Sequence, residues 1–219
     1  YFWRDIGAMV AGFGRAVSRS PTKRRRDEHF RLALKLIVAT CPVVGAGLAM
    51  NIYLEGGLRS LEVIAWATLG FAFLLYFADM TNMTVRKIEH FGLWSALVIG
   101  LFQVASLIPG TSRAGITMTT ARFLGIERRD AARFSMLLSI PVIIGAGTLK
   151  GLDLYHSGDA RLTSDAFTAA GLSFLFALVA IAVLMFWLKR ASFTPFVVYR
   201  IGLGGLLLYF AYWGPGSGP

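Results

Sequence analysis

Long apolar blocks separated by short polar segments constrain this chain more than any other feature of its sequence. Hydrophobic residues make up 56% of the 219 residues and charged residues only 16%, and the mean hydropathy is +0.62. An ordinary soluble domain contains more charge than this. The apolar blocks span, in order, residues 32–50, 61–78, 91–108, 116–124, 131–149, 166–188 and 193–213. Because a membrane-spanning helix needs about 20 apolar residues, the pattern predicts an all-α, polytopic membrane protein.

The third and fourth blocks predict a re-entrant helical hairpin rather than two spans. Residues 116–124 are too few to cross a bilayer, and Pro109-Gly110 interrupts the chain between the two blocks. Irregular backbone at membrane depth is tolerated where it lines a cavity or is buried in protein. We therefore expect a single integral membrane domain over residues 1–219, with about five full transmembrane helices and a re-entrant hairpin over residues 91–124 that carries the functional site.

The distribution of loop charges favours the same topology. With the hairpin, four loops lie on one side of the membrane and hold 14 Lys and Arg residues, against three on the other side. These loops are residues 15–31, 79–90, 125–133 and 189–190, and the three opposite residues are Arg59, Lys150 and Arg161. A single straight span through both blocks would move the later basic loops to the opposite side, against the positive-inside rule. The basic side is therefore assigned to the cytoplasm.

Residues 1–31 are expected to form an interfacial helix near residues 6–14, followed by a basic cytoplasmic loop. The chain starts with Tyr-Phe-Trp-Arg and no initiator Met, which is typical of the exit from an upstream apolar segment, so we expect an N-terminal part to be missing. A nucleic-acid-binding tail is the alternative for the basic run, but its position beside a span favours a loop without a nucleic-acid partner. The single cysteine, Cys41, excludes a disulfide framework.

The candidate site is the polar run Pro109-Gly110-Thr111-Ser112-Arg113-Ala114-Gly115-Ile116-Thr117. An arginine at the bilayer centre costs roughly 2.5 to 3.5 kcal/mol on insertion scales, so Arg113 needs a cavity or an anionic partner. The Pro-Gly turn frees backbone N–H groups at the start of the next helix, which Thr111 or Ser112 can cap. A helix N-terminus with an arginine in its first turn favours phosphate. The alternative is that Ser112 is only an N-cap and that Arg113 extends to the membrane interface.

Two further residues bear on this site. Thr117 lies four residues after Arg113 and shares its helix face, while Ser112 and Gly115 lie on an adjacent face, so the polar groups can converge on one ligand. Arg200 lies inside the last apolar block. It either contacts the same anion or bonds backbone carbonyls.

The remaining polar residues of the apolar blocks are expected to have structural roles. Asp79 and Arg133 lie near predicted span ends and are expected at the membrane interface, and Gln103 is expected to be a packing contact of the hairpin. The histidines lie in polar loops, and none is assigned a catalytic role: His29, His90 and His156.

The run from Pro109 to Thr117 resembles the Pro-Gly-x-Ser-Arg-Ser-x-x-Thr signature of the undecaprenyl pyrophosphate phosphatases, the bacitracin-resistance membrane proteins of bacteria. Family-like stretches continue in the same order at residues 2–4 (Phe-Trp-Arg), 131–141 and 192–200, so the match covers essentially the whole chain. One position departs from the signature, because its second serine is Ala114 here. That hydroxyl therefore cannot be essential if this protein is active.

The resemblance implies a multi-pass enzyme of the bacterial inner membrane that hydrolyses undecaprenyl diphosphate to undecaprenyl phosphate and inorganic phosphate. This reaction recycles the lipid carrier of peptidoglycan synthesis. The resemblance also implies an inverted-repeat fold, of which this chain is the second half. Ser112, Arg113 and Thr117 match the signature and are the candidate catalytic residues: Arg113 would hold the phosphate oxygens, Ser112 would donate a hydrogen bond or act as nucleophile, and Thr117 would support them by hydrogen bonding. The candidate substrate contacts are Gly110, Thr111, Gly115 and Arg200.

A divalent cation, Mg²⁺ or Ca²⁺, is implied by the resemblance only, with ligands expected from glutamates of the missing N-terminal part and none from this chain. We therefore expect residues 1–219 alone to be inactive. The expected partners are the polyprenyl diphosphate and membrane lipids, and a homo-oligomer is left open. Two alternatives are a polyprenyl-phosphate flippase, which would use Arg113 as a substrate anchor without hydrolysis, and a catalytically dead scaffold that binds no diphosphate.

Overall fold

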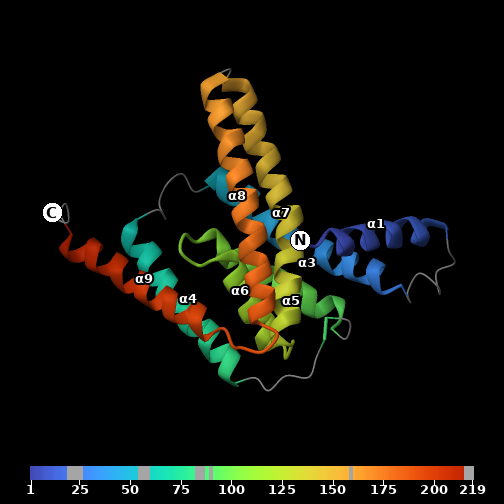
Figure 1. Cartoon of the computed structure of the whole chain (residues 1–219), viewed down its shortest axis with the longest axis horizontal. Coiled ribbons are helices and arrows are strands. Elements are labelled where there is room, and N and C mark those ends of the chain that lie inside the picture. The colour runs from blue at the N-terminus through green and yellow to red at the C-terminus, as the bar shows by residue number, and fades with distance from the viewer. Residues whose placement is uncertain (19–26, 54–59, 82–86, 89–90, 158–159, 215–219) are drawn as a thin grey trace.

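The computed structural model describes residues 1–18, 27–53, 60–81, 87–88, 91–157 and 160–214, and all regular structure in these ranges is helical (Figure 1). The basic residues 19–26, Arg59 and His90 lie outside the described residues. The helices are α1 (Trp3–Ser18), α3 (Glu28–Tyr53), α4 (Leu61–Thr81), α5 (Leu93–Gln103), the 3-10 helix η1 (Val104–Leu107), α6 (Arg113–Phe123), α7 (Arg128–Ser157), α8 (Ala160–Trp187) and α9 (Thr194–Trp213).

Five of these helices, α3, α4, α7, α8 and α9, are long and apolar enough to cross a membrane. This confirms the prediction of about five full spans in an all-α chain. Figure 1 shows α4 and α9 side by side, and α7 and α8 as a long hairpin that extends beyond the other helices. Many of the large apolar side chains of α8 are exposed, as expected for a surface that faces lipid rather than water.

Residues 93–123 form the helix–turn–helix expected for a re-entrant hairpin. The arms α5 and α6 have 11 residues each, so each is about 16 Å long, roughly half of a 30 Å hydrocarbon core. A Cβ atom on Gly100 would lie 2.4 Å from the carbonyl oxygen of Ala39, and this close approach holds α5 against α3. Gln103, at the end of α5, is fully buried, as expected of a packing position.

The helix ends assigned to the basic side lie together. The carboxylate of Asp79, near the end of α4, is 3.0 Å from Arg122 at the end of α6 and 2.7 Å from Arg128 at the start of α7. It also accepts a hydrogen bond from the backbone N–H of Phe193, directly before α9, at 3.2 Å. The C-terminal ends of α4 and α6 therefore lie beside the N-terminal ends of α7 and α9. The predicted topology places these four ends on the same, basic side of the membrane.

Asp79 lies near the end of the candidate span Leu61–Thr81, as predicted, but the sequence did not show that protein encloses its side chain. It is only 4% exposed and is enclosed by the two arginines because their charges offset the cost of burying its own. Arg133 differs, because its side chain keeps about a third of its surface exposed (31%) while it forms an ion pair with Asp5 of α1.

The tip of the hairpin lies far from this end of the bundle. Gly110 approaches Ile64 so closely that a Cβ atom at Gly110 would lie 2.3 Å from the Ile64 carbonyl oxygen. Thr68 donates a hydrogen bond to the carbonyl of Gly110 at 3.2 Å. Ile64 and Asp79 are separated along α4 by about 22 Å at 1.5 Å per residue. The hairpin therefore starts near the basic end and reaches the N-terminal half of α4.

Candidate functional site

A cavity of about 560 Å³ opens beside the tip of the hairpin. Most of its wall is apolar and comes from α4, α6, α7, α8 and α9, including Leu75, Met118, Met136, Leu184, Phe196 and Leu203. Its polar groups include Thr68, Ser112 and Arg200. An apolar wall with polar groups at one end suits an amphiphile whose apolar chain enters with its polar head.

Ser112 caps α6 and has an unusual backbone conformation. Its side-chain oxygen accepts a hydrogen bond from the N–H of Gly115 at 3.2 Å, which confirms the predicted N-cap, and its φ is +65°. Among the described residues it is the only non-glycine residue with positive φ. Such a conformation costs roughly 1 to 3 kcal/mol and is common where a site requires it. It directs the Ser112 side chain to the polar end of the cavity.

Two glycines allow the close approaches around this cap. Gly110 has φ +92° in addition to its contact with Ile64, so a side chain there would be strained as well as blocked. At Gly115, a Cβ atom would lie 2.8 Å from Nη1 of Arg200. The guanidinium of Arg200 therefore lies directly against the first turn of α6.

Arg200 donates hydrogen bonds to backbone carbonyls at the turn, which was one of the two roles predicted for it. Its Nη2 donates to the carbonyl oxygens of Gly110 at 2.8 Å, Thr111 at 3.0 Å and Thr68 at 3.4 Å. Arginine has five N–H donors, and these bonds use only one of the terminal nitrogens. Arg200 also lines the cavity, so its second predicted role, a contact with an anion, stays a prediction.

Arg113 and Thr117 lie on the face of α6 that packs against α7. Nη1 of Arg113 donates to the carbonyl of Ser139 at 3.3 Å, and the hydroxyl of Thr117, 1% exposed, is 2.6 Å from that of Ser135. Ser112, Gly115 and Arg200 line the cavity instead. The structure therefore brings these three together, and the convergence of Arg113 and Thr117 on the same ligand stays a prediction.

Sequence reasoning did not single out Ser135 and Ser139 of α7 or Thr68 of α4. The serines are four residues apart within the family-like block 131–141. This spacing places both on one helix face, which could have indicated a polar contact with a neighbouring helix. Thr68 gave no local signal, because its partner Gly110 is 42 residues away in the sequence. Thr111 is fully buried and contributes its carbonyl, rather than a cap, to the turn.

Thr117→Val is expected to destabilise the protein by about 1 to 2 kcal/mol, because it removes the buried hydrogen bond to Ser135, whose hydroxyl then keeps only its longer bond to the carbonyl of Ala114 at 3.3 Å. Thermal unfolding in detergent measures the effect. The control is Thr148→Val, which removes an exposed hydroxyl of α7 that donates to the carbonyl of Ile144 within its own helix, and it is expected to cost less than about 0.5 kcal/mol. Equal losses in the two variants would contradict the buried contact.

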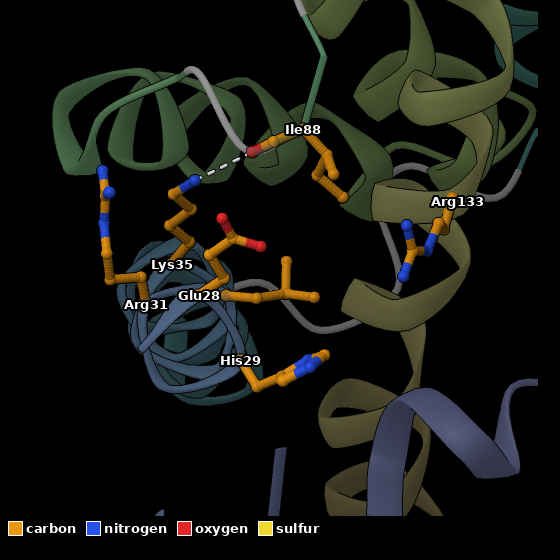
Figure 2. A pocket seen from close by; sticks show the side chains of 7 residues that line it. Glu28, His29, Arg31, Lys35, Ile88 and Arg133 are labelled. Carbon is orange, nitrogen blue, oxygen red and sulfur yellow. Dashed lines mark hydrogen bonds between the residues drawn. The ribbon is translucent and has the colours of Figure 1, made fainter. Parts of the chain in front are cut away.

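A second cavity, of about 50 Å³, lies at the basic end (Figure 2). It is lined by Glu28, His29, Arg31, Leu32, Lys35, Ile88 and Arg133. Two of its basic side chains already have partners. Lys35 donates a hydrogen bond to the carbonyl of Ile88 at 2.8 Å, and Arg133 forms an ion pair with Asp5. The small volume and these bonds indicate a contact between α3 and residues 87–88 rather than a substrate site.

The residues around the large cavity do not fit a divalent cation. Mg²⁺ and Ca²⁺ require several oxygen ligands, usually carboxylates. The cavity lining contains no Asp or Glu and includes the positive charge of Arg200. Within the described ranges, no group of three or more His, Cys, Asp or Glu residues is placed to hold a metal ion.

Comparison with known proteins gives consistent matches. The family model described as "Bacitracin resistance protein BacA" matches residues 1–206. A protein of Rhodospirillum rubrum named "Undecaprenyl-diphosphatase 1" is 47% identical over 221 residues, which cover 100% of this chain and 76% of the relative. A Ruegeria pomeroyi "Undecaprenyl-diphosphatase" is 46% identical over 97% of this chain and 78% of its own length. An Alteromonas mediterranea protein of the same name is 41% identical with the same coverage.

Proposed function

Because this chain belongs to the BacA family of bacitracin resistance proteins, we propose that it acts as an undecaprenyl-diphosphatase. It hydrolyses undecaprenyl diphosphate to undecaprenyl phosphate and inorganic phosphate, and so recycles the lipid carrier of peptidoglycan synthesis. One observation supports this most directly: an apolar cavity ends at a helix N-terminus that is flanked by an arginine. The isoprenoid chain fits the apolar wall, and the diphosphate fits the polar end.

The polar end can bind phosphate oxygens from two directions. The first N–H groups of α6 have no intrahelical acceptor, and Arg200 lies against the same turn. Arg113 starts α6 and bonds Ser139 through one nitrogen at 3.3 Å, which leaves donors of its guanidinium for the diphosphate. Two guanidinium groups on either side of the α6 N-terminus would stabilise the charge that develops on the transferred phosphoryl group.

Hydrolysis replaces the bond between the terminal phosphorus and the bridging oxygen by a bond to an incoming oxygen. The bridging oxygen leaves with the lipid monophosphate, where it is stabilised by the nearby guanidinium groups. Ser112 is the hydroxyl at the polar end of the cavity. It either donates a hydrogen bond to a phosphate oxygen while water attacks the phosphorus, or attacks the phosphorus itself and forms a phosphoserine, which water then hydrolyses to release inorganic phosphate and restore the hydroxyl. Ala114 also lines the cavity, in the place of the serine in the family signature.

The position of the hairpin tip suggests the side from which the substrate enters. The tip lies in the N-terminal half of α4, away from the end where the helices adjoining the basic loops meet. The positive-inside rule assigns that end to the cytoplasm. In a bacterial inner membrane the cavity would therefore take its lipid from the outer half of the bilayer.

The divalent cation is proposed on the resemblance alone, and its ligands would have to come from outside residues 1–219. The test uses an extended protein, made by joining residues 1–219 to the part of the Rhodospirillum rubrum relative that lies beyond the match. We expect the extended protein to release phosphate from undecaprenyl diphosphate and residues 1–219 alone to release none.

The same experiment separates hydrolysis from the competing flippase function. Phosphate release is measured in detergent, where transport across a bilayer does not contribute. Removal of divalent cations by a chelator is expected to abolish release, and their return to restore it. An extended protein that binds the lipid diphosphate without releasing phosphate under these conditions would exclude the proposed hydrolysis.

A further inference from the structure

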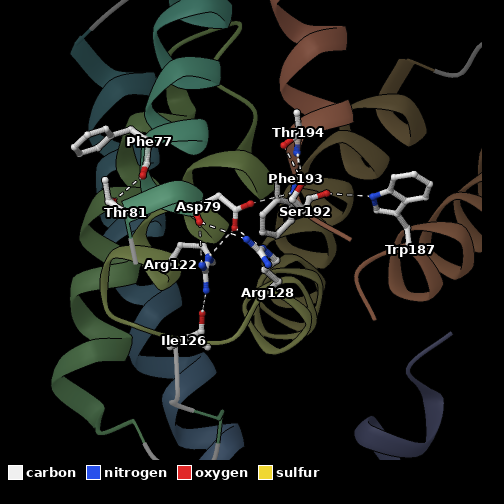
Figure 3. A network of polar contacts seen from close by, with 10 residues as sticks. All are labelled: Phe77, Asp79, Thr81, Arg122, Ile126, Arg128, Trp187, Ser192, Phe193 and Thr194. Atoms are coloured by element: carbon white, nitrogen blue, oxygen red, sulfur yellow. Dashed lines mark hydrogen bonds and ion pairs between the residues drawn. The ribbon is translucent and has the colours of Figure 1, made fainter. Parts of the chain in front are cut away.

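We propose that Asp79 is a positioning residue that holds the two helices carrying the polar groups of the cavity, α6 and α9, in a fixed relation. The expected effect of Asp79 on phosphate release rests on the proposed function, whereas its effect on the positions of α6 and α9 rests on the structure alone. Asp79 itself does not line the cavity. Figure 3 shows Asp79 beside Arg122 and Arg128. Arg122 is in the last turn of α6, at the opposite end of that helix from the N-cap Ser112.

Both carboxylate oxygens of Asp79 are used, and their partners come from three other elements. Oδ1 accepts from Nε of Arg128 at 2.7 Å and lies 3.0 Å from Nε of Arg122. Oδ2 accepts from the backbone N–H of Phe193 at 3.2 Å. One carboxylate on α4 therefore contacts the end of α6, the start of α7 and the residue that precedes α9.

Arg122 makes two further hydrogen bonds that link the end of α6 to the neighbouring backbone. Nη1 of Arg122 donates to the carbonyl of Ile126 at 2.8 Å, and its Nη2 donates to the backbone carbonyl of Asp79 at 3.3 Å. Arg122 is only 1% exposed. A guanidinium this deeply buried needs an opposite charge, so the position of the α6 C-terminus depends on the charge of Asp79 as well as on its shape.

The geometry connects this network to the cavity. Arg122 is in the last turn of α6, and Ser112 caps its other end about 15 Å away. A tilt of about 10° at the base would move Ser112 by roughly 3 Å. Phe193 starts the segment that carries Arg200, and Phe193 and Phe196 both line the cavity. Displacements of about 1 Å at a reacting group can lower rates about 100-fold.

The kinetic test compares variants of the extended protein. Asp79→Asn, which keeps the shape but removes the charge, is expected to lower kcat at least tenfold and to change KM less than about threefold, because the apolar wall still binds the lipid. Asp79→Glu restores the charge and is expected to recover most of kcat. The matched control is Arg133→Gln, which breaks the ion pair with Asp5 at the same end of the bundle and is expected to leave kcat within about twofold.

A second measurement reads the position of Ser112 without any turnover. Cys41→Ser first removes the only cysteine of the 219 residues, and Ser112→Cys then introduces one at the cavity. The rate at which a maleimide labels this cysteine is compared between variants at the same concentration of folded protein. Adding Asp79→Asn is expected to change the labelling rate at least fivefold, whereas adding Arg133→Gln is not. An unchanged rate overturns the positioning role, whatever the kinetics. If the extended protein has no phosphatase activity, the proposed function fails and the labelling rate alone decides the role of Asp79.

Discussion

Replacing Arg113 by alanine is expected to lower phosphate release by the extended protein at least about 1,000-fold, without loss of membrane insertion. The variant removes one of the two guanidinium groups next to the α6 N-terminus. A positioned arginine that offsets charge on a transferred phosphoryl group is typically worth three to five orders of magnitude. The measurement is the initial rate of phosphate release at saturating lipid diphosphate, together with the yield of protein in the membrane fraction.

Two further variants test whether this loss comes from Arg113 itself. Arg113→Lys keeps the charge but not the planar, forked set of donors, so it should recover only part of the activity. Arg4→Ala removes an arginine that packs on the ring of Trp3 in α1, far along the chain from the hairpin, and should leave the rate within about twofold. Turnover like that of the unmodified protein in Arg113→Ala would restrict Arg113 to its contact with Ser139.

The parts of the fold that could be predicted are those with a local physical cause. Span length and hydropathy are properties of single segments, so the five long helices were found from the sequence. The hairpin followed from a block too short to cross and from loop charges. A cap by Thr111 or Ser112 was expected because both are N-cap residues close after Pro-Gly, and the structure selects Ser112, whose bond to Gly115 spans only three residues.

The parts that could not be predicted depend on contacts between distant segments. The sequence placed Asp79 near a span end but did not show its partners, which are at positions 122, 128 and 193. For Arg200 the sequence left two roles open, and only the packing of α9 against α4 places its Nη2 beside the carbonyl of Gly110, 90 residues away. The faces of α6 follow from helical periodicity, but which face borders the cavity depends on the position of α7.

Replacing Ser112 by alanine is expected to lower the rate of phosphate release about 100-fold. The change removes both the hydroxyl at the polar end of the cavity and the oxygen that accepts from the N–H of Gly115. One lost hydrogen bond to a charged group accounts for a loss of roughly ten- to a hundredfold. Complete loss of activity would instead indicate that the Ser112 oxygen attacks the phosphorus.

Two other substitutions at the same position separate the roles of the hydroxyl, the cap and the backbone. Ser112→Gly accommodates the φ of +65° without strain, but it lacks both the hydroxyl and the cap. Ser112→Asn tolerates positive φ and supplies an oxygen that can cap α6. If the hydroxyl acts on the substrate, all three variants are expected to lose activity to a similar degree, although the asparagine variant unfolds at a higher temperature than the alanine variant. If Ser112→Asn is as active as the unmodified protein, the hydroxyl only caps the helix. The phosphate would then be bound by the N–H groups of α6 and the two arginines, with no direct part for Ser112.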